Sequence, residues 1–84
     1  MEVLDAVCVT LRLNGPKVEV LVASPLLPKP YVALSVDKEA LKAYHKHYGM
    51  DAVEDLVLSS IEPLLRQILR SQLNKILKEG ESNG

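Results

Sequence analysis

The side chains best suited to chemistry are clustered in one short segment, Tyr44 to Tyr48, which contains two histidines. Histidine is a common metal ligand and a common acid–base catalyst. In a helix, however, His45 and His47 would point about 200° apart and could not bind the same ion. Zinc sites require further ligands at characteristic spacings, and the sequence shows no such spacing. We therefore expect neither a metal nor a cofactor, and interpret His45 and His47 as a solvent-exposed pair near a helix end.

Cys8 is the only cysteine and therefore the only thiol that could act as a nucleophile. A catalytic thiol needs a base beside it, and none is close in the sequence. Cys8 lies within an apolar, β-branched segment, where a lone cysteine usually behaves as a small hydrophobic residue. Glycine-rich phosphate loops, nucleophile elbows and HExxH motifs are also missing from the sequence. The sequence thus predicts a protein that is not an enzyme.

The composition describes one small domain with a mixed surface charge. The chain has 84 residues, 48% of them hydrophobic, with no Phe or Trp and a formal net charge of −1. This balance argues against binding to nucleic acid or anionic lipid by bulk electrostatics. A single cysteine fits a reducing compartment. Glu2 and Asp5 stand where a signal peptide would carry positive charge, and no apolar run approaches the length of a membrane span. We expect a cytoplasmic protein without a membrane role.

Three β-branched segments with alternating polarity predict strands. They are residues 2–13, 17–23 and 31–36. Asn14-Gly15 is a strong hairpin signal, but a two-residue turn over this pair would need the N–H that Pro16 lacks. We therefore expect a loop from Asn14 to Lys17.

Residues 24–30 contain three prolines and predict an extended connector. Pro25 and Pro28 match the bare PxxP spacing of ligands for proline-binding domains. Because flanking arginines are absent, we interpret the segment as a stiff linker.

Two helices follow the strands. Asp37 is suited to cap the first, which should end at Gly49. The second should run over residues 51–79. Pro63 falls inside it and predicts a kink or a short break near residues 59–62, because proline lacks an N–H and clashes with the preceding turn. A straight helix of this length would measure about 42 Å, against about 30 Å for a compact domain of this size.

Strands followed by helices predict an α+β fold. We expect a three-stranded antiparallel sheet in the order β-β-β-α-α, with both helices on one face and the C-terminal helix long and kinked near Pro63. A single domain should occupy residues 1–79, and residues 80–84 should form a flexible tail.

The apolar residues of the long helix form two adjacent ridges. The first contains Val53, Val57, Ile61, Leu64 and Ile68, and the second contains Leu58, Leu65, Leu69, Leu73 and Ile76. One small sheet cannot cover both ridges, although packing of both within a monomer is the simpler alternative. We therefore predict a small assembly or adaptor subunit that oligomerises, or binds a protein partner, through the apolar ridges of this helix, with the second ridge as the contact residues. An edge of the sheet could add a further contact.

Basic residues suggest an alternative function. They lie in two rows, Lys38, Lys42, His45 and Lys46 on the first helix and Arg66, Arg70 and Lys78 on the second. In a dimer these rows could form a stripe that binds the phosphates of nucleic acid. Glu39, Asp55 and Glu62 interrupt the rows, which favours a solvated charged face instead. The nucleic-acid-binding module, with Lys38, Lys42, Lys46, Arg66 and Arg70 as contacts, is the second hypothesis.

Overall fold

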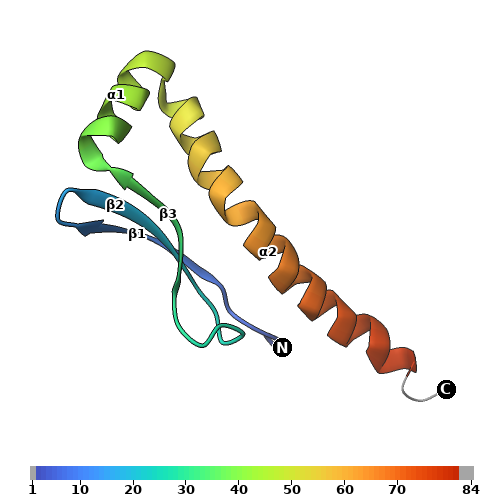
Figure 1. The fold of residues 1–84 in the computed structure, drawn as a ribbon. Coiled ribbons are helices and arrows are strands. Elements are labelled where there is room, and N and C mark those ends of the chain that lie inside the picture. Colours follow the sequence, from blue (N-terminus) through green and yellow to red (C-terminus); the bar gives the residue numbers. More distant parts are fainter. Residues whose placement is uncertain (1, 82–84) are drawn as a thin grey trace.

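A computed structural model of the chain describes residues 2–81 and has the predicted α+β fold (Figure 1). In chain order its elements are β1 (Cys8–Asn14), β2 (Lys17–Ala23), β3 (Tyr31–Asp37), α1 (Lys38–Tyr48) and α2 (Met50–Glu81). The strands form one antiparallel sheet in the order β1-β2-β3. The predicted order of three strands followed by two helices is confirmed.

The hairpin between β1 and β2 closes with a tight turn. Asn14 pairs with Lys17, so only Gly15 and Pro16 form the loop, which is shorter than the predicted loop from Asn14 to Lys17. Gly15 has a φ of 60°, which only glycine adopts readily. The missing N–H of Pro16 is harmless here because Pro16 lies outside the paired residues.

The first strand is shorter than predicted. It begins at Cys8, which pairs with Ala23, the last residue of β2. Residues 2–7 have no strand beside them, because the chain turns after Ala23. Alternating apolar residues alone could not show where the partner strand ends.

The proline-rich connector is a turn and not the extended segment that the sequence predicts. The N–H of Leu27 donates to the carbonyl of Ser24 at 2.9 Å, and the N–H of Leu26 donates to the Ser24 hydroxyl at 3.2 Å. These bonds fold the middle of the PxxP segment. A polyproline helix has no such internal bonds, so this conformation does not present a proline-rich ligand.

Local signals set both ends of α1. The Asp37 carboxylate accepts a hydrogen bond from the N–H of Glu39 at 2.9 Å, which is the predicted cap. The N–H of Lys38 donates to the carbonyl of Pro16 at 2.8 Å and ties the helix start to the hairpin turn. At the other end Gly49, with a φ of 87°, donates to the carbonyl of His45. The chain then turns directly into α2.

Helix α2 continues across Pro63 without the predicted break. Ile61 and Ile68 lie on either side of Pro63 and are both buried in the core. Seven residues make about two helical turns, so a continuous helix keeps both side chains facing the sheet. A break would turn one of them away, and this packing offsets the hydrogen bond lost at Pro63. The kink in the continuous helix stays a prediction.

The helix also extends slightly beyond its predicted end. It includes Gly80 and Glu81, which the sequence assigned to the tail. Helix ends vary by one or two residues between assignments, so the difference is small. The rest of the predicted tail, residues 82–84, lies outside the described residues.

The core is thin and lies between β2 and α2. Among the described residues, only Val20, Val22, Ile61 and Ile68 are buried. Figure 1 shows α2 passing along one side of the sheet and extending beyond it, with α1 at the end of β3. The molecule measures 57 × 24 × 21 Å, and its radius of gyration is 16.7 Å. A compact chain of this length would have a radius of gyration of about 12 Å. The fold is therefore elongated.

Candidate association surface

The two predicted ridges of α2 have different environments. The first contributes Ile61 and Ile68 to the core, with Val57 and Leu64 partly buried beside them. The second, which we call the outer ridge, consists of Leu58, Leu65, Leu69, Leu73 and Ile76. Leu65 packs against the core, but the other four side chains are each more than half exposed. The outer ridge is thus an apolar surface that the monomer leaves largely uncovered.

A groove of about 470 Å³ follows part of the outer ridge. Its lining consists of Leu58, Ile61, Leu65 and Leu69, together with Glu62 and Arg66. Arg66 donates from Nε and Nη2 to one carboxylate oxygen of Glu62, at 3.0 and 2.7 Å. The groove therefore has an apolar floor and an edge that carries both charges.

Strand β1 adds a second apolar surface, which we call the open β1 face. It consists of Val9, Leu11 and Leu13, opposite Val22, Val20 and Val18 of β2. Paired residues lie on the same face of a sheet, so this face continues the one that α2 covers. Yet Val9, Leu11 and Leu13 are 45%, 63% and 67% exposed. The coverage of β1 therefore decreases from its start towards the hairpin turn.

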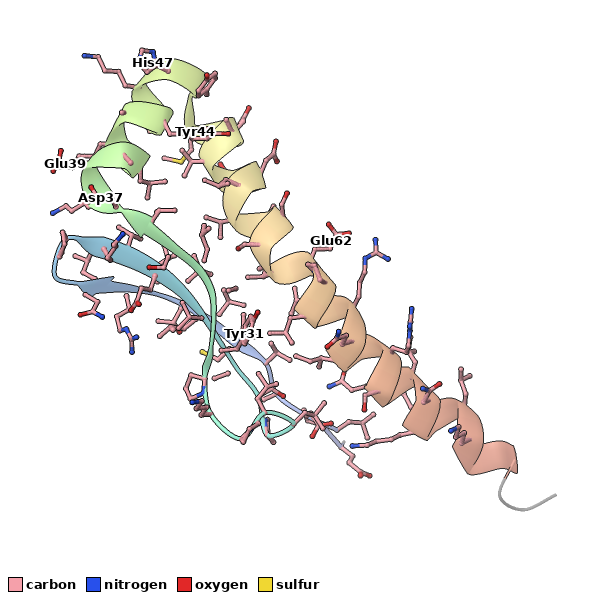
Figure 2. The ribbon with its side chains drawn as sticks, viewed as in Figure 1. Tyr31, Asp37, Glu39, Tyr44, His47 and Glu62 are labelled. Atoms are coloured by element: carbon pink, nitrogen blue, oxygen red, sulfur yellow. The ribbon has the colours of Figure 1, made fainter. Side chains whose placement is uncertain are left out.

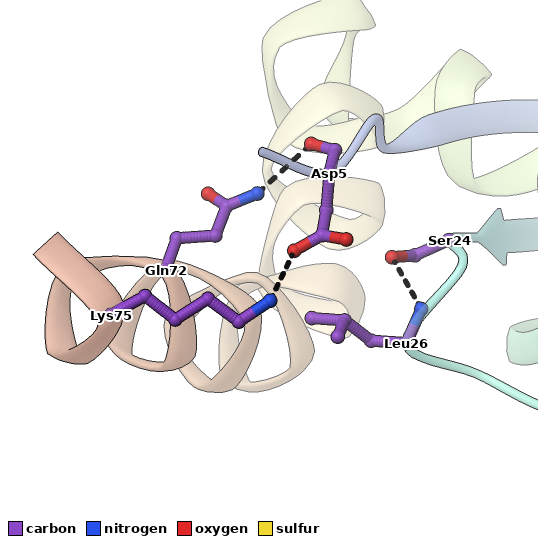
Figure 3. A network of polar contacts seen from close by, with 5 residues as sticks. All are labelled: Asp5, Ser24, Leu26, Gln72 and Lys75. Atoms are coloured by element: carbon purple, nitrogen blue, oxygen red, sulfur yellow. Dashed lines mark hydrogen bonds and ion pairs between the residues drawn. The ribbon is translucent and has the colours of Figure 1, made fainter. Parts of the chain in front are cut away.

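Contacts made by Asp5 explain this gradient (Figure 3). Its carbonyl accepts a hydrogen bond from Nε2 of Gln72 at 2.9 Å, and its carboxylate lies 3.2 Å from Nζ of Lys75. Asp5 precedes β1, so the C-terminal half of α2 lies beside the segment that leads into the start of β1. The hairpin end of β1, with Leu11 and Leu13, is left uncovered.

Sequence reasoning missed the open β1 face as a candidate site. The alternation of Val9, Leu11 and Leu13 is visible in the sequence. It predicts an apolar strand face, but it does not say whether a helix covers that face. Coverage depends on the diagonal path of α2, which no local pattern encodes.

The opposite face of β1 is polar. Arg12 donates from Nε and Nη2 to one carboxylate oxygen of Glu19, at 2.9 and 2.7 Å. Cys8 lies 3.4 Å from the hydroxyl of Thr10 and is exposed. The sequence predicted that Cys8 would pack like a small hydrophobic residue, and this prediction is wrong. Its polar-face position leaves it open to labelling reagents.

The structure does not bring the two basic rows together. Lys38, Lys42, Lys46, Arg66 and Arg70 are all exposed. Lys42 lies 3.5 Å from Glu39 on α1, and Arg66 is paired with Glu62 on α2. Figure 2 shows Glu39 and Glu62 on opposite sides of the molecule. Two of the basic residues thus have acidic partners, and one chain does not form a continuous basic stripe.

The described residues show no cluster suited to metal binding. Nowhere in this part of the chain do three His, Cys, Asp or Glu side chains converge. His45 and His47 are exposed near the end of α1, and the ring of His47 lies 6.3 Å from that of Tyr48. Tyr48 in turn packs beside Tyr44 with ring centroids 4.9 Å apart. The rings of Tyr44, His47 and Tyr48 thus form a small aromatic cluster near the C-terminal end of α1.

Within residues 2–81, no helix combines the length and apolar character needed to cross a membrane. Comparison of the chain with protein-family models, with curated proteins and with solved structures finds no match.

Proposed function

We propose that this protein is a non-catalytic assembly subunit that associates with a second copy of itself through the outer ridge of α2. The observation that carries this proposal is the amount of surface the single chain exposes. Its accessible surface is 6485 Å². A compact monomer of 9.3 kDa is expected to expose about 5,000 Å². The chain thus exposes about 1,500 Å² more than a compact monomer would.

This excess has the size of a stable dimer interface. Two chains that each bury about 1,500 Å² would bury about 3,000 Å² in total, within the range of obligate homodimers. The apolar character of the exposed surface agrees, since obligate interfaces resemble a domain core cut in half. Leu58, Leu69, Leu73 and Ile76 supply such a surface in one line along α2.

The charge pattern favours a second copy over a strongly charged partner. The groove along the outer ridge has one acidic and one basic residue at its edge, Glu62 and Arg66. The whole chain has a formal net charge of −1. A two-fold interface uses the same patch on both subunits and needs a self-complementary surface. A patch that carries both charges meets this requirement. We also propose a cytoplasmic location for the assembly, because a lone cysteine fits a reducing compartment.

The small core suggests that the chain depends on association for its stability. Only a few aliphatic side chains are buried in the described part of the chain. Small domains with so little core usually need a disulfide, a metal or a partner for stability. We therefore expect association to contribute much of the folding stability.

The test is a pair of matched double substitutions. Leu69→Asp with Leu73→Asp places charge on the outer ridge at two exposed positions and should give a protein of 9.3 kDa by light scattering, where the unmodified chain gives twice that mass. Gln67→Asp with Asn74→Asp adds the same two carboxylates to exposed polar positions on the other side of the same helix and should leave the dimer intact. Equal masses for both variants and the unmodified chain would contradict the proposal.

A further inference from the structure

We propose that strand β1 forms the second contact of this assembly, by pairing antiparallel with β1 of the second copy. The two sheets would then form one six-stranded sheet around a two-fold axis. This inference rests on the proposed self-association and specifies its geometry. It follows from three features of the molecule: the free edge of β1, the open β1 face and the diagonal path of α2.

The free edge of β1 is suited to strand pairing. Within the described residues, β1 pairs with β2 on one side and with no strand on the other. Exposed edge strands usually carry a proline, a bulge or an inward-pointing charge that prevents pairing. Strand β1, CVTLRLN, has no proline, its register with β2 is regular, and its inner face is apolar. The other edge, β3, is interrupted by a bulge opposite Val20 and Leu21.

Two-fold pairing would also cover the open β1 face. In an antiparallel pair, the start of one β1 lies beside the hairpin end of the other. The C-terminal half of α2 crosses its own chain near the start of β1, where Gln72 and Lys75 contact Asp5. The partner's α2 would therefore pass beside Leu11 and Leu13. The exposed end of the outer ridge, with Leu73 and Ile76, is apolar and would meet them there.

The register follows from the length and faces of the strand. Leu11 is the midpoint of β1, so centring the pair on Leu11 pairs all seven residues. This register places odd-numbered residues opposite odd-numbered ones, and both open faces then lie on the same side of the sheet. It also places Arg12 opposite Thr10 of the second copy. Centring on Arg12 would instead oppose two like charges, which destabilises a sheet.

The lone exposed cysteine allows a direct distance measurement. A spin label on Cys8 should report about 20 Å between the two copies, since six residue steps of about 3.4 Å separate these positions across the axis. Moving the label to the hairpin, in a Cys8→Ser, Lys17→Cys variant, should give a distance of about 25 Å. Lys17 pairs with Asn14, so the two labels are then separated by about six residue steps along the strands and about three strand spacings of about 4.8 Å across them. Leu69→Asp with Leu73→Asp should abolish both distances.

The possible outcomes separate this inference from the proposed function. A dimeric mass with a Cys8 distance beyond about 35 Å would overturn the pairing of β1, while association through α2 would still stand. Distances of about 15 Å or less at both positions 8 and 17 would show a parallel arrangement and would also overturn it. A monomeric mass for the labelled and unlabelled chains would overturn the proposed function and this inference together.

Discussion

At the scale of single residues, Gly49 sets the direction in which α2 leaves α1. Its φ of 87° and ψ of 175° lie in a region that is essentially restricted to glycine. A Cβ at this position would meet no atom within 4 Å, so the cost of a substitution is one of backbone conformation alone. Gly49→Ala should therefore lower the free energy of unfolding by about 1–3 kcal/mol, measured by urea denaturation. The neighbouring Met50→Ala should change it by less than about 0.5 kcal/mol. Equal effects would contradict this role of Gly49.

Asp37 is the second residue with a local role that can be measured. Its carboxylate caps α1 by accepting the N–H of Glu39. Asp37→Ala should cost about 1 kcal/mol and lower the melting temperature by about 4–8 °C. Asp37→Asn keeps an acceptor oxygen and should retain most of the stability. A variant with Asn as unstable as that with Ala would show that the cap is not the stabilising contact.

At the scale of elements, Pro63 is the clearest test of how packing overrides local preference. Proline inside a helix costs about 3 kcal/mol relative to alanine, yet α2 is continuous across it. Pro63→Ala should restore the N–H that faces the carbonyl of Ser59 and raise the free energy of unfolding by up to about 3 kcal/mol. Because the helix is already unbroken, circular dichroism should show almost no gain in helix content. A large gain would indicate that the helix is interrupted in solution.

The elements differ in how far the sequence predicts them. The cap at Asp37, the end of α1 at Gly49 and the limits of β2 follow from local chemistry and were predicted correctly. The continuity of α2 was not, because it depends on Ile61 and Ile68 packing on one sheet face. The open β1 face could not be predicted either. Its exposure arises from the angle at which α2 crosses the sheet, which is a tertiary property.

At the scale of the whole molecule, charge distinguishes the proposed function from nucleic-acid binding. With three or four phosphate contacts per subunit, a dimer that binds duplex DNA would show a log–log salt slope of about −5 to −7. We expect no measurable binding to DNA or RNA at physiological salt, because the net charge is −1 and each basic row contains a residue paired with a glutamate. Replacing Lys38, Lys42 and Lys46 by alanine should leave self-association unchanged. Salt-sensitive binding that this triple variant loses would favour the nucleic-acid-binding module.

Because the whole molecule is elongated, its mass in solution shows whether it self-associates. An 84-residue chain with a radius of gyration of 16.7 Å and exposed apolar surfaces on α2 and β1 should not exist alone at micromolar concentration. Sedimentation equilibrium of the unmodified chain measures its mass without labels or substitutions. We expect twice the monomer mass of 9.3 kDa, with dissociation only on dilution. A mass of 9.3 kDa that stays constant from micromolar to millimolar concentration would contradict it.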